Sequence, residues 1–200
     1  MKTTIFTFFL SFCASFAFAQ IDRSFQPTPG PAPTINIEKP YTFKLDNGLK
    51  VMVVENHKLP KVSMTLTIDN SPILEGEKAG VSSLTGEMLG TGTAKMSKDD
   101  FNEKVDYLGA NIWYGSQSAG ANSLSKYFPE ILELLADGAI NPVFTQEEFD
   151  KKKTQLIESI KSGEKNVSVI QRRVSGALTF GLDHPYGEFV SQETINNIQL

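Results

Sequence analysis

The chain has 200 residues, a formal net charge of −4 at pH 7 and one cysteine. This length fits one domain, or one domain with a tail. The mild acidity argues against a protein that binds nucleic acid or anionic lipid surfaces, because both ligands select basic surfaces.

The first nineteen residues have the composition of a secretory signal. Lys2 supplies a basic start, an apolar run covers residues 5–18, and Ala17 and Ala19 form an A-x-A pattern. This arrangement predicts a signal peptide over residues 1–19 that is cleaved after Ala19. We therefore expect an exported protein, either periplasmic or secreted.

Two alternatives for this segment are a transmembrane anchor and a lipoprotein signal. The apolar run is shorter than the ~20 residues that a membrane-spanning helix needs. Cys13 lies inside the segment, but bulky Phe12 precedes it and apolar residues continue after it. Cleavage would remove Lys2 and the only cysteine, which leaves a charge of −5 and no disulfide. Stability must then come from a hydrophobic core.

Residues 20–40 read as a proline-rich linker. This stretch holds five of the ten prolines of the chain, at positions 27, 29, 31, 33 and 40. Proline fixes φ and removes a hydrogen-bond donor, so an extended, solvated tether is expected here.

The folded part begins at Tyr41 with strands. Apolar and polar residues alternate on both sides of Asp46-Asn47-Gly48, which predicts a β-hairpin. The same alternation over residues 61–69 predicts a third strand. The period then changes to that of a helix over residues 79–89, which glycines 90 and 92 end.

Capping signals and periodicity place the remaining elements. Ser97 with Asp100, and Thr145 with Glu148, predict capping boxes that begin two helices. Ser125 is expected to cap a third helix. The predicted spans are helices over 98–108, 125–139, 145–160 and 167–180, strands over 111–114 and 116–124, a turn over 183–187, and a further element from residue 194.

Paired strands that alternate with paired helices indicate an α+β fold. We expect one sheet, mainly antiparallel or mixed, with helices packed on one face.

Residues 41–200 resemble the amino-terminal half-domain of the insulinase/pitrilysin (M16) family of zinc metallopeptidases, the inverzincins. The resemblance rests on an opening F-x-L-x-N-G-L-x-V hairpin, a helix that ends in G-T, an L-G-A tripeptide, paired helices after Asn141-Pro142 and the tetrapeptide HPYG. Their order and spacing are specific together. The half-domain would normally continue beyond Leu200, so this one is expected to be truncated.

The family's zinc helix carries H-x-x-E-H, three positions after a glycine and five before G-T. Aligned on Gly80 and on Gly92-Thr93, the two histidines fall on Ser83 and Glu87, and the glutamate falls on Gly86. The chemistry needs imidazoles at i and i+4, on one helix face, to hold zinc, and a carboxylate at i+3 to take a proton from metal-bound water. All three residues are replaced, so no catalytic residue is assigned.

The third zinc ligand of the family is a glutamate on a later helix. Glu158 falls on that position or one residue from it, with Ser159 as its neighbour. Two carboxylates, Glu87 and Glu158, would suit magnesium or calcium better than zinc, and solvated helix glutamates are the simpler interpretation. The two histidines, His57 and His184, lie far apart in the sequence and do not indicate a metal site.

The register of the altered helix suggests two faces. Leu84, Met88 and Leu89 are expected in the core. The motif positions 83, 86 and 87 are expected on an open face that leaves space for a polypeptide.

The resemblance implies an exported, non-catalytic subunit that assembles with an active M16 peptidase chain or half-domain and helps to bind its polypeptide substrate. Zinc is then expected only in the active partner or half. Two alternatives remain open: an active zinc metalloendopeptidase whose catalytic half follows residue 200, and an exported binding domain with no proteolytic partner. No nucleic acid and no membrane anchor are expected.

Overall fold

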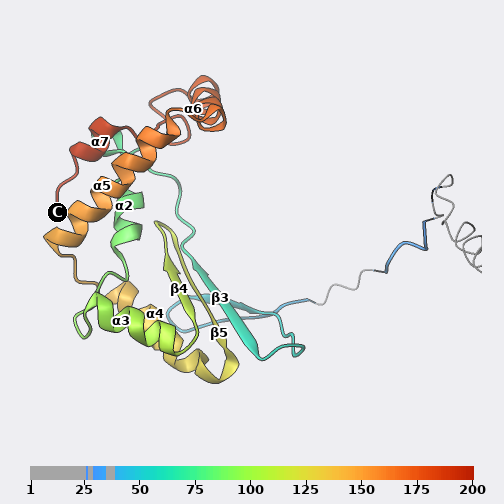
Figure 1. Cartoon of the computed structure of the whole chain (residues 1–200). Helices are drawn as coiled ribbons and strands as arrows, with labels where there is room; N and C mark the ends of the chain where they lie inside the picture. The colour runs from blue at the N-terminus through green and yellow to red at the C-terminus, as the bar shows by residue number, and fades with distance from the viewer. Residues whose placement is uncertain (1–25, 27–28, 35–38) are drawn as a thin grey trace, which may run out of the picture. The chain divides into compact units, whose positions relative to one another are not determined.

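The computed structural model describes residues 26, 29–34 and 39–200 (Figure 1). The chain divides into two compact units, Met1–Glu55 and Asn56–Leu200. The expected signal peptide lies outside the described residues, as does most of the expected linker. No described helix is long and apolar enough to span a membrane.

The first unit contains the predicted hairpin. Strands β1 (Tyr41–Lys44) and β2 (Lys50–Val53) pair antiparallel, with Tyr41 opposite Val53. Gly48 adopts a φ of 91°, and the side chain of Asn47 accepts a hydrogen bond from the Leu49 amide at 3.0 Å. The turn therefore has the left-handed glycine that the Asn-Gly pair predicts.

The second unit is built on a three-stranded antiparallel sheet of order β3-β5-β4. Its strands are β3 (Lys61–Thr67), β4 (Asn111–Tyr114) and β5 (Ser118–Leu124). The α+β class and the antiparallel pairing are confirmed. The strands form two sheets instead of the single one expected, because the described pairings keep the β1–β2 hairpin separate.

Helices α3 (Lys98–Tyr107) and α4 (Phe128–Ile140) pack on one face of this sheet (Figure 1). The small side chains of Ala119 and Ala121 on β5 let the helices approach closely. The buried cluster they form consists of Phe101, Val105, Leu108, Ala119, Ala121, Ile131, Leu134 and Leu135. On strand β4, Trp113 lies across Gly120, where a Cβ would stand 2.6 Å from the indole ring.

A second cluster holds three helices together. Helix α2 (Val81–Met88) follows the short 3₁₀ helix η1 (Gly76–Lys78) and packs against α5 (Gln146–Gly163), which also contacts α7 (Gln192–Asn196). The buried residues of this cluster are Leu84, Met88, Phe149, Ile160, Ile195 and Ile198.

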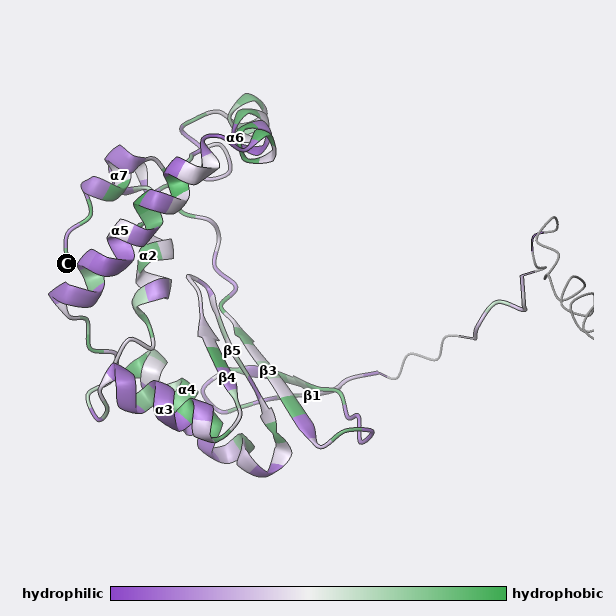
Figure 2. Ribbon diagram, in the orientation of Figure 1, coloured by the Kyte–Doolittle hydropathy of each residue, from purple (hydrophilic) through white to green (hydrophobic). Residues whose placement is uncertain are grey.

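Helix α6 (Val167–Phe180) buries none of its side chains. Asn166 caps its start by accepting hydrogen bonds from the amides of Ser168 and Val169. Gly181, with a φ of 85°, ends it. Figure 2 shows apolar residues along its ribbon.

Two of the predicted helix caps are present and the third is wrong, and among the described helices the reciprocal bond of a full capping box occurs only at Ser191. Ser97 and Thr145 accept hydrogen bonds from the amides of Asp100 and Glu148, as N-caps do. Ser125 instead opens a 3₁₀ helix, η2 (Ser125–Tyr127), and α4 begins only at Phe128. The Ser125 amide donates to the Pro60 carbonyl at 3.0 Å, which ties this turn to the start of β3.

Candidate functional site

The altered zinc helix, α2, begins at a left-handed glycine held from two sides. Gly80 has a φ of 102°, and a Cβ there would stand 2.4 Å from the side chain of Ile195. The carboxylate of Glu75 accepts hydrogen bonds from the amides of Gly80 at 2.5 Å and Ser82 at 3.0 Å. A carboxylate at this end satisfies free amides and complements the positive pole of the helix.

Two of the three motif positions on α2 face solvent. Ser83 and Glu87 are exposed, one helical turn apart. On the other side of the helix, Leu84 and Met88 are buried against α5 and α7. The predicted division of α2 into an open face and a core face is therefore confirmed for these four residues.

Gly86, in the place of the catalytic glutamate, does not lie on the open face. It is buried, and a Cβ on it would stand 2.6 Å from the carbonyl carbon of Gly115 and 2.7 Å from the amide nitrogen of Ser116. The expectation of open space at this position is wrong. The backbone of the turn between β4 and β5 occupies it.

The fourth motif residue, Glu158, lies on α5, the helix that packs against α2. Glu158 and its neighbour Ser159 are both exposed, whereas Ile160 turns into the core. No group of three or more histidine, cysteine, aspartate or glutamate side chains that could hold a metal occurs among the described residues. A hydroxyl, a glycine and two carboxylates are not a zinc donor set, so the residues present do not fit zinc.

His184 does not supply the missing zinc ligand. His184 accepts a hydrogen bond from the Tyr186 amide through Nδ1 at 3.1 Å. Its ring stacks on Phe180 with centroids 5.3 Å apart, at the end of α6. His184 therefore packs against the end of the preceding helix.

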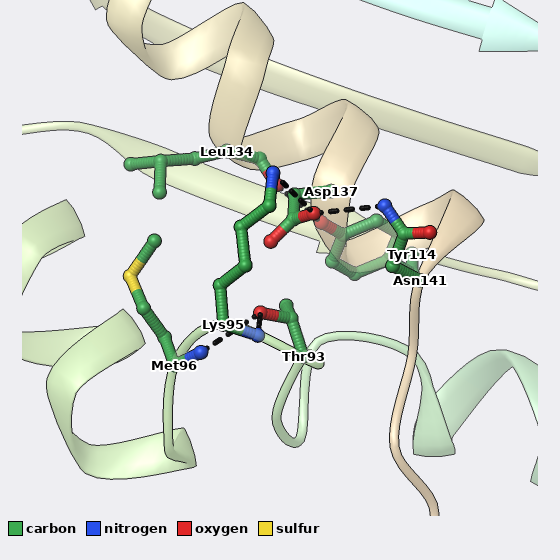
Figure 3. A network of polar contacts seen from close by, with 7 residues as sticks. All are labelled: Thr93, Lys95, Met96, Tyr114, Leu134, Asp137 and Asn141. Atoms are coloured by element: carbon green, nitrogen blue, oxygen red, sulfur yellow. Dashed lines mark hydrogen bonds and ion pairs between the residues drawn. The ribbon is translucent and has the colours of Figure 1, made fainter.

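The G-T end of the altered helix is tied to α4 by a polar network (Figure 3). The hydroxyl of Thr93 accepts hydrogen bonds from the amides of Lys95 and Met96, each at 3.1 Å. Asp137, buried on α4, accepts a hydrogen bond from the Asn141 side chain at 2.9 Å and lies 3.4 Å from the Lys95 ammonium. These contacts fix the loop that leaves α2.

Tyr114 completes this network from the sheet. Its hydroxyl donates to the Leu135 carbonyl at 3.1 Å, and its ring lies where a Cβ on Gly90 or Gly138 would collide with it. Burial, and then the charge of Asp137, raise the pKa of Tyr114. The hydrogen bond from Asn141, with help from the Lys95 charge, lowers the pKa of the Asp137 carboxyl.

Sequence reasoning missed Asp137, Tyr114 and Glu75. Asp137 had a visible signal, because it is one of only two acids, with Glu133, in the apolar stretch ILELLADGAI. A carboxylate there must find partners once it is buried. Tyr114 carries no such signal, since its partner carbonyl lies 21 residues away on α4. Glu75 precedes the predicted helix by several residues, and its bonds to the amides of Gly80 and Ser82 follow no standard capping spacing.

A groove of the second unit lies beside the G-T loop. It has a volume of about 550 Å³ and is lined by the loop Thr91–Asp99 and by residues near the start of α5, among them Glu147 and Glu148. Lys98 donates to Glu148 at 2.6 Å across it, and this hydrogen bond lowers the pKa of Glu148. None of the four motif positions lines this groove, so it is separate from the altered zinc helix.

Solved structures share this fold. The chain aligns with the crystal structure of a peptidase M16 inactive domain from Pseudomonas fluorescens at a TM-score of 0.72 and 24% identity, over 82% of this chain and 41% of that one. It aligns with a protease from Helicobacter pylori at a TM-score of 0.66 and 19% identity, over 81% and 41% of the two chains. These alignments establish an α+β fold of the M16 type.

The sequence comparisons carry the assignment further. The family model described as Insulinase (Peptidase family M16) matches residues 50–181, so the chain belongs to this family. It is 26% identical over 154 residues to the mitochondrial-processing peptidase subunit beta of Rattus norvegicus and of Mus musculus. Each alignment covers 74% of this chain, which spans about a third of those relatives, 31% of their length.

Proposed function

We propose that this chain is an exported, non-catalytic M16 subunit. In this role it assembles with a zinc-bearing M16 chain or half-domain and helps to bind the polypeptide substrate. The proposal rests on the residue types at the three motif positions. Ser83 and Glu87 supply no imidazole, and Gly86 supplies no base.

The packing of Gly86 supports the absence of a catalytic base, because it leaves no room for a glutamate side chain at this position. A glutamate in this place would have to displace the backbone of the β4–β5 turn, which stands within 2.6 Å of where the Cβ would be. A backbone segment yields less readily than the end of a flexible side chain. The helix therefore keeps its scaffold role while its chemistry is absent.

The relatives support a role in an assembly. Three of them are named as a subunit, beta, of mitochondrial-processing peptidase, and one similar structure is described as an inactive domain of peptidase M16. A chain that retains this fold without the zinc ligands fits such a role, because fold and chemistry are separable.

Metal analysis and peptide turnover test the proposal. The purified chain should contain no stoichiometric zinc and should not cleave unfolded peptides, with or without added metal. Adding a zinc-bearing M16 chain from the same organism should give turnover above that of the added chain alone.

Two results would overturn the proposal. One zinc per chain, lost on mutation of Glu87 or Glu158, would mean an active peptidase with unusual ligands. Peptide binding by this chain, without any effect on the zinc-bearing chain, would favour an exported binding domain.

A further inference from the structure

Another groove of the second unit is bordered by the polar side of α6 and by the turn that follows this helix. It has a volume of about 480 Å³, which is in the size range of ligand sites. The rings of Phe180 and Tyr186 form its aromatic wall. The polar residues that line it recur at spacings of four, three and four residues, which places them on one side of α6: Ser168, Arg172, Ser175 and Thr179.

The aromatic wall of this groove is held in place against α6. The Tyr186 amide donates to Nδ1 of His184 at 3.1 Å, and the Tyr186 ring meets that of Phe180 edge-on, with centroids 5.3 Å apart. Beside this wall the helix and the turn are in contact, because a Cβ on Gly176 would stand 2.8 Å from the Tyr186 carbonyl oxygen. The groove is therefore formed before a ligand arrives, which lowers the entropic cost of binding.

Arg172 is the one charged residue that lines the groove. Within the described part of the chain its guanidinium makes no ion pair and no hydrogen bond. The acids nearest to α6 on either side in the sequence, Glu164 and Asp183, do not line the groove. Arg173 is engaged elsewhere, 5.8 Å from the centroid of the Phe189 ring. Arg172 therefore offers a planar fork of donors to an anion in the groove.

The groove also offers neutral donors that the helix itself does not use. In other helices, Thr85 and Thr154 donate their hydroxyls at 2.8 Å to the carbonyl four residues earlier. The hydroxyls of Ser168, Ser175 and Thr179 make no hydrogen bond to any residue that the structure describes. They stand on the same side of α6 as the guanidinium, so a ligand that binds Arg172 can accept hydrogen bonds from its neighbours as well.

We propose that this groove binds a carboxylate of a polypeptide segment, with an apolar side chain of the segment packed on Phe180 and Tyr186. One guanidinium matches the single charge of a carboxylate, whereas phosphate groups are met by clusters of basic residues. The length of the groove favours a polypeptide over a small acid. From Ser168 to Thr179 the helix rises ~16 Å, the length of about five residues of extended chain.

This site goes beyond the proposed assembly role, because it requires neither zinc nor a partner chain. It is tested on the chain alone, so its failure and the failure of the assembly proposal can be told apart. The first probe is a short peptide that ends in phenylalanine with a free carboxylate. The second is the same peptide with a terminal amide, and the third has a glutamate beside the phenylalanine and a terminal amide. Binding is followed by NMR, at the Nε–H group of Arg172 and the backbone amides of α6.

A peptide with a carboxylate should shift the Arg172 Nε–H signal, and the probe that binds identifies a terminal or a side-chain carboxylate as the source. The amidated peptide without a carboxylate should not bind. Arg172→Gln should weaken binding by about tenfold or more, because charge-assisted hydrogen bonds are lost. Arg172→Lys keeps the charge and loses the fork, so it should weaken binding several-fold. Glycine in place of the phenylalanine should also weaken binding, because nothing then packs on the aromatic wall.

Two control variants separate the groove from the rest of the surface. Lys161→Met removes a positive charge from an exposed residue of α5 that does not line the groove. Leu178→Ser changes a residue of α6 that is 83% exposed and does not line the groove. Both variants should bind the peptides like the parent. All the variants should melt like the parent, because Arg172, Lys161 and Leu178 are exposed.

Four results would overturn the proposal. The first is that neither carboxylate peptide shifts the α6 signals at millimolar concentration. The second is that the amidated peptide binds as tightly as the carboxylate peptides, and the third is that Arg172→Gln binds them like the parent. The fourth is that inorganic phosphate shifts the same signals at the same or a lower concentration, which would make the groove a general anion site.

Discussion

Gly86 of α2 and Gly115 of the β4–β5 turn lie in close backbone contact, at a separation that leaves no room for a Cβ on Gly86. The altered zinc helix and the hairpin are thus packed through two glycines. Gly86, which the resemblance to the family aligns with its catalytic base, is part of the packing between helix and sheet.

The first prediction concerns this contact. Replacing an interior helix glycine by alanine normally stabilises a helix by about 1 kcal/mol. For Gly86→Ala we expect the opposite, a net loss of about 1–3 kcal/mol, because the new methyl group meets backbone. Gly163→Ala, at the last residue of α5, is the control without a backbone clash, since its Cβ would meet only Val169 at 3.4 Å. Equal melting temperatures for the two variants would show that the turn moves aside easily.

The second prediction restores the imidazoles without the base. Ser83 and Glu87 are exposed at i and i+4, so Ser83→His with Glu87→His should create a divalent metal site without disturbing the core. Added zinc should raise the melting temperature, by mass action on the folded state. No peptide cleavage should follow, because Gly86 cannot take a proton. Ser82→His with Glu87→His has the wrong spacing and should show a smaller zinc effect; an equal effect would argue against a helical i,i+4 site.

The third prediction is a pH dependence centred on Asp137. Its pKa is lowered in the folded chain, mainly by the hydrogen bond from Asn141. The folded state therefore gains stability above the unfolded pKa of about 3.9, and it loses that stability as the pH falls through the lower folded value. Asp137→Asn should remove this part of the acid dependence in thermal melts between pH 2 and pH 6, a range set around that pKa. Asp106→Asn, the same change at an exposed site, should leave the slope intact.

The fourth prediction separates the two faces of α2. Ser83 is exposed and Leu84 is 2% exposed. Ser83→Trp should be nearly neutral for stability, whereas Leu84→Asp should cost several kcal/mol because it buries a charge. In a reconstituted pair, Ser83→Trp should lower peptide turnover if this face handles substrate. Unchanged turnover would remove the face from substrate handling, and a melting temperature as low as that of Leu84→Asp would mean that the serine is buried.

The fifth prediction concerns the amino terminus. Export should remove residues 1–19 and leave Gln20 first, either as glutamine or in its cyclised form. Mass spectrometry of the mature protein measures this directly. An intact Met1, or a lipid on Cys13, would contradict the expected signal.

Local signals account for most of the elements. Asp46-Asn47-Gly48 specifies a hairpin, and Ser97 and Thr145 mark helix starts, because each acts on its own immediate backbone. The prediction that Ser125 caps α4 was wrong, and here the contact is not local. Its amide is engaged by the Pro60 carbonyl, a partner more than sixty residues away that no local pattern reveals.

At the candidate site, too, some features could be predicted from the sequence and others depend on contacts between distant segments. The absence of zinc ligands at Ser83, Gly86 and Glu87 is what the resemblance to the M16 motif implies, whereas the core role of Leu84 and Met88 follows from the helical spacing. The burial of Gly86 depends on a turn 29 or more residues later in the chain. The Asp137–Asn141–Lys95 network likewise joins a helix to a distant loop. Contacts of this kind follow from tertiary packing and produce no periodic pattern in the sequence.

The placement of Trp113 gives the protein a built-in optical reporter. It is the only tryptophan of the chain, and it lies across Gly120 on the sheet, away from the cluster that joins α2, α5 and α7. Its emission follows the pairing of β4 with β5, whereas far-ultraviolet circular dichroism is dominated by the helices. The two hydrophobic clusters share no residue. Coincident curves from the two signals would mark cooperative unfolding, and separated curves would reveal which cluster loosens first.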